Sequence, residues 1–144
     1  MLISLTTYAQ EKLVALTIDS ELKEKANAVI RTNDISITIE AFNKFTYKNK
    51  RIVTVLNEAG KGDVGAVVSY DNNKNIKKLE AIIYDAFGQE IKKVKKKQFK
   101  DVSAADGISL YLDSRVKYLD YTPVSYPYTV VFETEQVYKS TAFI

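Results

Sequence analysis

Apolar and polar residues alternate along much of the chain, with the period of two that is typical of β-strands. Ile35, Ile37 and Ile39 alternate with polar residues, which predicts a strand buried on one face. The segment 51–57 is apolar on both faces and predicts a central strand. Further strands are expected at 77–84, 90–99, 115–121 and 128–138, with a shorter one at 109–112. About seven short strands separated by turns predict a mostly β fold, an antiparallel β-sandwich of Ig-like architecture.

Turn-forming residues separate these strands. The segments 71–75 and 85–88 contain Asp, Asn and Gly, which bond their own backbone or adopt conformations that other residues avoid. Gly60 and Gly88 are both expected in turns, where a positive φ is often needed. The segment 64–70 fits either a strand or a helical turn.

One short helix is expected near the N-terminus, over 17–26. Ile18, Leu22 and Ala26 would share one face of this helix, and Thr17 or Asp19 could cap its first turn. We expect the helix to close one end of the sheet rather than to carry a function.

The composition is that of a single folded domain. The chain has 144 residues, of which 46% are hydrophobic and 27% are charged, and this is enough to bury a core. We expect that core to contain Ile37, Ile39, Val53, Val55, Leu79, Ile83, Val130 and Phe132. The net charge of +3 is small and selects no class of partner.

The sequence contains no His, no Cys and no Trp. The absence of His and Cys excludes a Ser-His-Asp triad, a thiolate nucleophile and an ordinary structural zinc site. We therefore predict no catalytic residue, no metal ligand, no cofactor and no enzymatic activity in this chain.

A group of aspartates is the remaining candidate for acid–base chemistry or calcium binding: Asp101, Asp106, Asp113 and Asp120. Their spacing does not fit an EF-hand loop, because Val102 and Ala104 would stand at the first two ligand positions. The segment that begins at Asp71 has Asp or Asn at the first three ligand positions, but Ile76 and Ile82 stand where the loop needs its glycine and its final carboxylate. A carboxylate hydrolase that uses Asp101, Asp106 or Asp113 is the least favoured hypothesis, since it needs one raised pKa and a cleft between the carboxylates.

The most basic segment, 92–100, contains six lysines: Lys92, Lys93, Lys95, Lys96, Lys97 and Lys100. These lysines could bind an anionic polymer such as a glycan, or lipid head groups, together with the nearby Tyr84. The alternative is a solvated edge strand, on which lysines prevent edge-to-edge aggregation. The run contains no arginine, which specific nucleic-acid recognition commonly uses, so no nucleic-acid partner is expected.

The two ends lead us to expect a piece of a longer, exported protein. Residues 1–10 begin apolar, and Thr7 and Ala9 have the spacing that signal peptidase reads before Gln10. This segment is interpreted as the remnant of an export signal or a disordered lead-in, the other reading being a buried strand. Residues 11–144 would form one β-sandwich domain, truncated at its C-terminal end. No stretch approaches the ~20 apolar residues of a membrane span.

Five stretches, read together, are similar to a known family: 26–31, 51–60, 76–88, 113–117 and 127–133. In order and spacing they resemble the N-terminal domain of unknown function found ahead of the transglutaminase-like domain in exported proteins of Gram-negative bacteria. The resemblance implies a β-sandwich, an export signal and a papain-like transglutaminase domain further along the polypeptide. The family's catalytic Cys, His and Asp belong to that later domain, so none of them transfers to this chain.

We therefore expect a non-catalytic accessory or interaction module of an exported transglutaminase-like protein, in the periplasm or outside the cell. Its partner would be the downstream transglutaminase-like domain, with an envelope protein or a glycan as further candidates. The alternative function is a module that binds an anionic polymer through 92–100.

Overall fold

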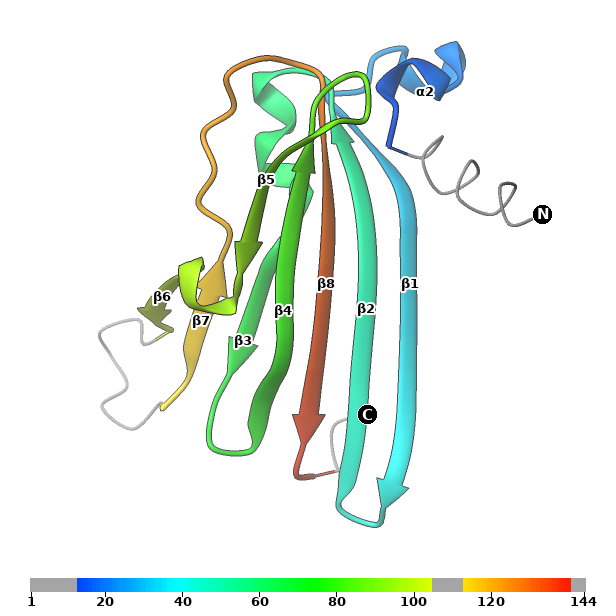
Figure 1. The fold of residues 1–144 in the computed structure, drawn as a ribbon. Helices are drawn as coiled ribbons and strands as arrows, with labels where there is room; N and C mark the ends of the chain where they lie inside the picture. Colours follow the sequence, from blue (N-terminus) through cyan, green and yellow to red (C-terminus); the bar gives the residue numbers. More distant parts are fainter. Residues whose placement is uncertain (1–12, 105–112, 141–144) are drawn as a thin grey trace, which may run out of the picture.

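A computed structural model describes residues 13–104 and 113–140 (Figure 1). Short helical turns are few within these residues: η1 (Ala15–Thr17), α2 (Ser20–Lys23), η2 (Glu58–Val64) and η3 (Lys96–Gln98). Most of the described chain is extended, in the strands β1 (Ala28–Ala41), β2 (Lys44–Val55), β3 (Val67–Tyr70), β4 (Lys74–Tyr84), β5 (Glu90–Lys95), β6 (Lys100–Ser103), β7 (Arg115–Tyr118) and β8 (Tyr128–Tyr138).

The strands form two antiparallel sheets. The larger sheet has five strands in the order β1-β2-β8-β4-β5, and the smaller has three in the order β3-β7-β6. In Figure 1 the smaller sheet lies on the β4–β5 side of the larger one, while β1 and β2 extend away from it. The predicted mostly β, antiparallel fold with two packed layers is confirmed.

The hydrophobic core lies between the two sheets, and β8 runs through its centre. Val55, Ile83 and Val130 are at most 1% exposed, and Val68 of the smaller sheet packs into the same cluster. β8 lies between β2 and β4, so its first five residues are all buried. The predicted core residues that the structure confirms are Val53, Val55, Leu79, Ile83, Val130 and Phe132.

The other two predicted core residues are exposed. Ile37 is 48% exposed and Ile39 is 65% exposed, so the prediction of a half-buried strand was wrong for this part of β1. The register places Ile37 opposite Tyr47 and Ile39 opposite Phe45, and every second residue of β2 from Phe45 to Val55 shares the face that packs on the core. The isoleucines therefore face the correct side, but no described strand lies over them.

Asp and Asn side chains build the predicted turns. The N–H of Asn73 donates to Oδ1 of Asp71 at 2.7 Å between β3 and β4. Between β4 and β5, Oδ1 of Asp85 accepts the N–H groups of two later residues, and Gly88 has a φ of +81°. These positions confirm the turns at 71–75 and 85–88.

Gly60 needs another explanation. It lies in η2 and is buried, and its φ is not positive. A Cβ at this position would stand 2.1 Å from the carbonyl oxygen of Asn27. Glycine is therefore required by the close approach of two backbone segments, and not by the left-handed conformation that we expected.

Several predicted elements are longer than the elements that the structure contains. The helix expected over 17–26 is the four-residue α2, with Leu22 58% exposed. The strand expected over 90–99 ends at Lys95, where the Gln98 side chain accepts the Lys95 N–H at 2.8 Å. The segment 64–70 becomes β3 in its second half. The expectations for 1–10 and 109–112 lie outside the described residues.

Candidate functional site

The six lysines of 92–100 do not lie on one strand. Lys92, Lys93 and Lys95 belong to β5, which forms one edge of the larger sheet. The next two belong to η3, and Lys100 begins β6 in the smaller sheet. The run therefore passes from one sheet to the other. The edge position of β5 fits the interpretation that its lysines keep this edge from pairing with another chain.

Part of this positive charge is used within the domain. Nζ of Lys93 lies 3.6 Å from a carboxylate oxygen of Glu80 on the neighbouring strand. Nζ of Lys96 donates to the carbonyl oxygen of Ile76 at 2.8 Å. Among residues 13–104 and 113–140, the lysines of the run that form no ion pair and no side-chain hydrogen bond through Nζ are Lys92, Lys95 and Lys97. Tyr84 pairs with Glu90, at the end of the β4–β5 pairing that is farthest from Lys95.

The predicted aspartates are engaged separately. Oδ2 of Asp101 accepts a hydrogen bond from the Tyr70 hydroxyl at 2.6 Å, and Oδ1 accepts one from Nε of Arg115 at 2.9 Å. Lys117 adds a second cation, with Nζ 3.1 Å from Oδ2. The Tyr70 hydrogen bond, followed by those of Lys117 and Arg115, lowers the pKa of Asp101 to about 2. A general acid needs a raised pKa, so Asp101 is poorly suited to that role.

The remaining aspartates of this group have other partners. Oδ2 of Asp113 accepts a hydrogen bond from the Asn72 amide at 3.0 Å. Asp120 lies 3.9 Å from Nζ of Lys100, and Asp106 lies outside the described residues. In the part of the chain that the structure describes, no group of three or more acidic side chains is arranged to hold a metal ion.

An uncovered apolar surface lies at the opposite edge of the larger sheet. We define the isoleucine row as Ile35, Ile37 and Ile39, which stand at alternate positions of β1 and are 54%, 48% and 65% exposed. Phe42, at the tip of the β1–β2 hairpin, is 96% exposed. β1 pairs with β2 alone among the described strands, so one side of its backbone is also unpaired.

Two unpaired polar atoms lie beside the isoleucine row. Asn49 stands opposite Ile35 on one side and opposite Thr134 on the other. Oδ1 of Asn49 and Oγ1 of Thr134 are buried, and neither has a hydrogen-bond partner among the described residues. Thr134 is 6% exposed. Buried polar atoms normally have a partner, so these two atoms are exceptions within the part of the chain that the structure describes.

The two edges of the larger sheet differ in chemistry. β5 carries three lysines in six residues, whereas β1 contains no lysine or proline from Ile35 to Ala41. Soluble proteins protect exposed edges with lysine, proline or short strands. β5 has this protection, and β1 (14 residues) does not. The edge at β1 is therefore the better candidate for contact with another polypeptide.

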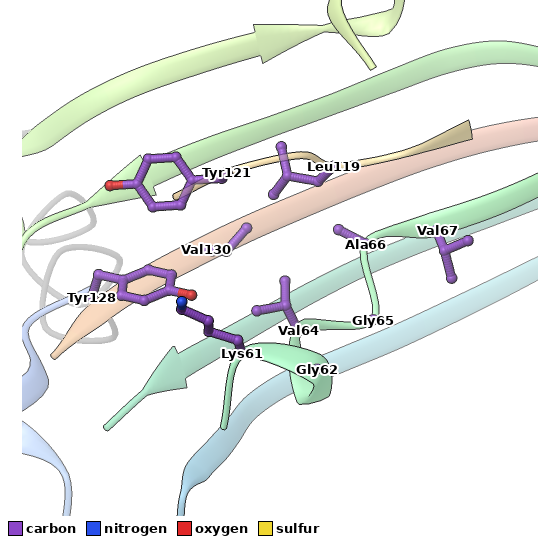
Figure 2. A pocket seen from close by; sticks show the side chains of 10 residues that line it. All are labelled: Lys61, Gly62, Val64, Gly65, Ala66, Val67, Leu119, Tyr121, Tyr128 and Val130. Atoms are coloured by element: carbon purple, nitrogen blue, oxygen red, sulfur yellow. The ribbon is translucent and has the colours of Figure 1, made fainter. Parts of the chain in front are cut away.

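A small pocket lies between η2, the start of β3 and the segment that leads into β8 (Figure 2). We call it the tyrosine pocket, and its volume is about 200 Å³. Its apolar wall comes from four side chains of three segments: Val64, Ala66, Leu119 and Val130. Its polar groups are the ammonium of Lys61 and the hydroxyl of Tyr128, which Figure 2 shows close together, whereas the hydroxyl of Tyr121 points away from the apolar wall.

The polar end of the tyrosine pocket is formed by closely packed rings and one cation. The rings of Tyr121 and Tyr128 meet edge to face, with centroids 5.5 Å apart. Tyr128 is 3% exposed, and burial raises its pKa to about 12. Hydrogen bonds with Glu58 and Tyr126 raise the pKa of Lys61, so it remains an ammonium at neutral pH. Sequence reasoning missed this pocket, although four tyrosines within 118–128 were a visible signal.

A family comparison decides the classification of the chain. Residues 42–143 match the model of a domain of unknown function with a solved structure, DUF3857. The chain belongs to the DUF3857 family. The match begins at the tip of the β1–β2 hairpin, so the isoleucine row lies before the matched region. No curated protein matches the chain.

The fold of this DUF3857 member is also similar to a solved structure from Parabacteroides distasonis, which is named a "putative protease". The TM-score is 0.65 with 15% sequence identity, over 79% of this chain and 23% of the other. At this identity the similarity establishes the fold and not an activity. The chain thus spans about a quarter of the length of the solved protein that it matches. No helix among the described residues is long and apolar enough to cross a membrane.

Proposed function

We propose that this DUF3857 domain is a non-catalytic interaction module of an exported, transglutaminase-like protein, acting in the periplasm or outside the cell. In this role it docks a neighbouring domain of the same polypeptide, and any transglutaminase or protease-like chemistry belongs to that domain. The observation that carries the proposal is the isoleucine row on the uncovered part of the larger sheet.

The physical argument begins with solvation. Three isoleucines at alternate positions of an edge strand present apolar surface, together with backbone N–H and C=O groups that pair with no other described strand. An extended segment that pairs with β1 would satisfy the backbone groups and cover the side chains, as in recognition by strand addition.

The choice of a neighbouring domain as the occupant rests on the family and on length. The resemblance given in the sequence analysis implies a transglutaminase-like domain further along the polypeptide. The solved protein of similar fold is about four times longer than the part that this chain matches. A domain held in one polypeptide needs only a modest interface, because the linker raises the effective concentration of the partner.

The test is binding between the purified chain and the flanking segments of the full-length gene product, measured by isothermal titration calorimetry. Ile37→Lys should abolish binding without lowering the melting temperature, because the side chain is already 48% exposed. Ile91→Lys on β5 is the matched control, at 50% exposure on the opposite edge, and should bind normally. Equal binding by the two variants would contradict the proposal, as would transglutaminase or protease activity of the chain alone. If the chain forms a homodimer that Ile37→Lys dissociates, the occupant of the isoleucine row is a second copy of the chain and not a neighbouring domain.

A second candidate function is binding of an anionic polymer. It is favoured by Lys92, Lys95 and Lys97, whose ammonium groups have no partner among the described residues. Binding of heparin or phosphatidylglycerol vesicles would fall steeply with salt if these cations made the contact. Neutralising all three to Gln should then reduce the salt slope by about 1 per lysine. Unchanged binding by the triple variant would exclude this candidate.

A further inference from the structure

The tyrosine pocket lies away from the isoleucine row and has the composition of a ligand site. It combines an apolar wall with a small number of converging polar groups, as binding pockets commonly do. Its volume of about 200 Å³ corresponds to roughly six water molecules. This is room for a short carbon chain or one amino-acid side chain.

The hydroxyl of Tyr128 in the pocket is available to a ligand. Tyr128 is 3% exposed and has ring contacts with Tyr121 and Tyr126, and no described residue forms a hydrogen bond with its hydroxyl. The hydroxyl stays protonated at neutral pH and so acts as a donor, because burial holds its pKa at about 12. A phenolic hydroxyl can both donate and accept, and a carboxylate oxygen in the pocket would take its donated hydrogen bond.

The ammonium of Lys61 supplies the positive charge. Its interaction with Glu58, at 3.3 Å, is exposed, and the Glu58 side chain is 82% accessible. An ion pair of this kind contributes little, so an anion in the pocket can compete with Glu58 for the ammonium.

We propose that the tyrosine pocket binds an apolar group that ends in a carboxylate, with Lys61 and Tyr128 holding the carboxylate. The apolar part of the ligand lies against Val64, Ala66 and Val130 at the base of the pocket. One ammonium and one neutral phenol match a single negative charge. A phosphate dianion would keep one negative charge without a cation to balance it, and it has no apolar part to pack against the wall. The proposed chemistry is shared by short-chain carboxylic acids and by the C-terminal residue of a peptide.

The experiment is an NMR titration of the ¹⁵N-labelled chain with hexanoate, hexanol and methyl phosphate to about 50 mM, since a ligand of this size is expected to bind in the millimolar range. Hexanoate should shift the amide signals of Gly62, Gly65 and Leu119 and bind about tenfold more tightly than hexanol. N-acetyl-leucine and N-acetyl-leucinamide test the peptide C-terminus as the ligand. The acid should bind more tightly than the neutral amide, as hexanoate should bind more tightly than hexanol.

Two variants assign the contacts. Lys61→Gln and Tyr128→Phe should each weaken hexanoate binding about tenfold and leave hexanol binding unchanged. Lys97→Gln and Tyr118→Phe are matched controls, because both side chains lie outside the pocket and should bind hexanoate normally. Absence of hexanoate shifts, equal binding of hexanoate and hexanol, or wild-type binding by Lys61→Gln would overturn the proposal. None of these results depends on the isoleucine row, so they leave the proposed docking function to its own test.

Discussion

The hydroxyl groups of Thr54 and Thr129 share a hydrogen bond of 2.8 Å between β2 and β8, and both residues are completely buried. They are opposite each other in the strand register and face away from the main core. Ala15 and Ile18 of the N-terminal segment are also buried and lie outside the main core cluster. The larger sheet therefore has buried residues on both of its faces.

Breaking this threonine pair should destabilise the domain. Thr54→Val leaves the Thr129 hydroxyl buried without a partner, and we expect a loss of about 1–3 kcal/mol in the free energy of unfolding. The double variant Thr54→Val/Thr129→Val removes both polar groups and should recover most of that loss. Urea unfolding of the single and double variants measures the difference. A double variant that is no more stable than Thr54→Val would contradict the prediction.

Gly60→Ala should destabilise the domain through backbone crowding. The added Cβ would stand 2.1 Å from the carbonyl oxygen of Asn27, which already accepts the N–H of Leu56 at 2.9 Å. We expect a loss of about 1–3 kcal/mol, as for other overpacked sites. Gly62→Ala is the control in the same turn, because no atom lies within 4 Å of its added Cβ. Chemical unfolding measures the stability of both variants. Equal stability would contradict the prediction, because it would show that the backbone shifts away from the added Cβ at little cost.

Stability at low pH should depend on Asp101. Its pKa is about 2 in the folded protein, below the value of about 3.9 for an unperturbed Asp. The ionised carboxylate therefore stabilises the folded state above about pH 4, and this contribution is lost as the pH falls through both values. NMR titration of Tyr70→Phe should give a higher Asp101 pKa than the wild type, since the Tyr70 hydrogen bond is the largest cause of the shift. An unchanged titration midpoint would exclude that cause.

A carboxylate introduced at an apolar position should unfold the domain on β2 but leave its stability almost unchanged on the neighbouring β1. Val55→Asp places a charge at a site that is 0% exposed and should unfold the domain, at a cost of more than about 4 kcal/mol. Ile39→Asp, at 65% exposure, should change stability by less than about 0.5 kcal/mol. Circular dichroism during thermal unfolding distinguishes the two. A folded Val55→Asp variant would mean that the core admits water at this position.

The contrast between Val55 and Ile39 shows what the sequence could and could not predict. A period of two identifies which residues share a face of a strand, and that interpretation held for both strands. Burial also requires an opposing layer, and the width of the smaller sheet is set by contacts between distant segments. No local pattern in 35–39 reveals that β3, β6 and β7 stop short of β1.

The candidate site was harder to predict than the fold. The lysine run is contiguous in sequence and was found, but its division between β5 and β6 follows from the local turn at Gln98. The tyrosine pocket unites Lys61, Leu119 and Tyr128, which lie far apart in the sequence. Only the pairing of β3 with β7, and the return of the chain into β8, brings them together.

The position of β8 has a consequence for synthesis. β8 is the last described strand of the chain, yet it lies in the middle of the larger sheet, between β2 and β4. Until residues 128–138 leave the ribosome, the β1–β2 and β4–β5 hairpins cannot join, and both keep unpaired inner edges. Contacts between distant segments make folding slow and expose such edges. The nascent chain therefore depends on late completion of the sheet, and an mRNA truncated before β8 would release two separate hairpins prone to aggregation.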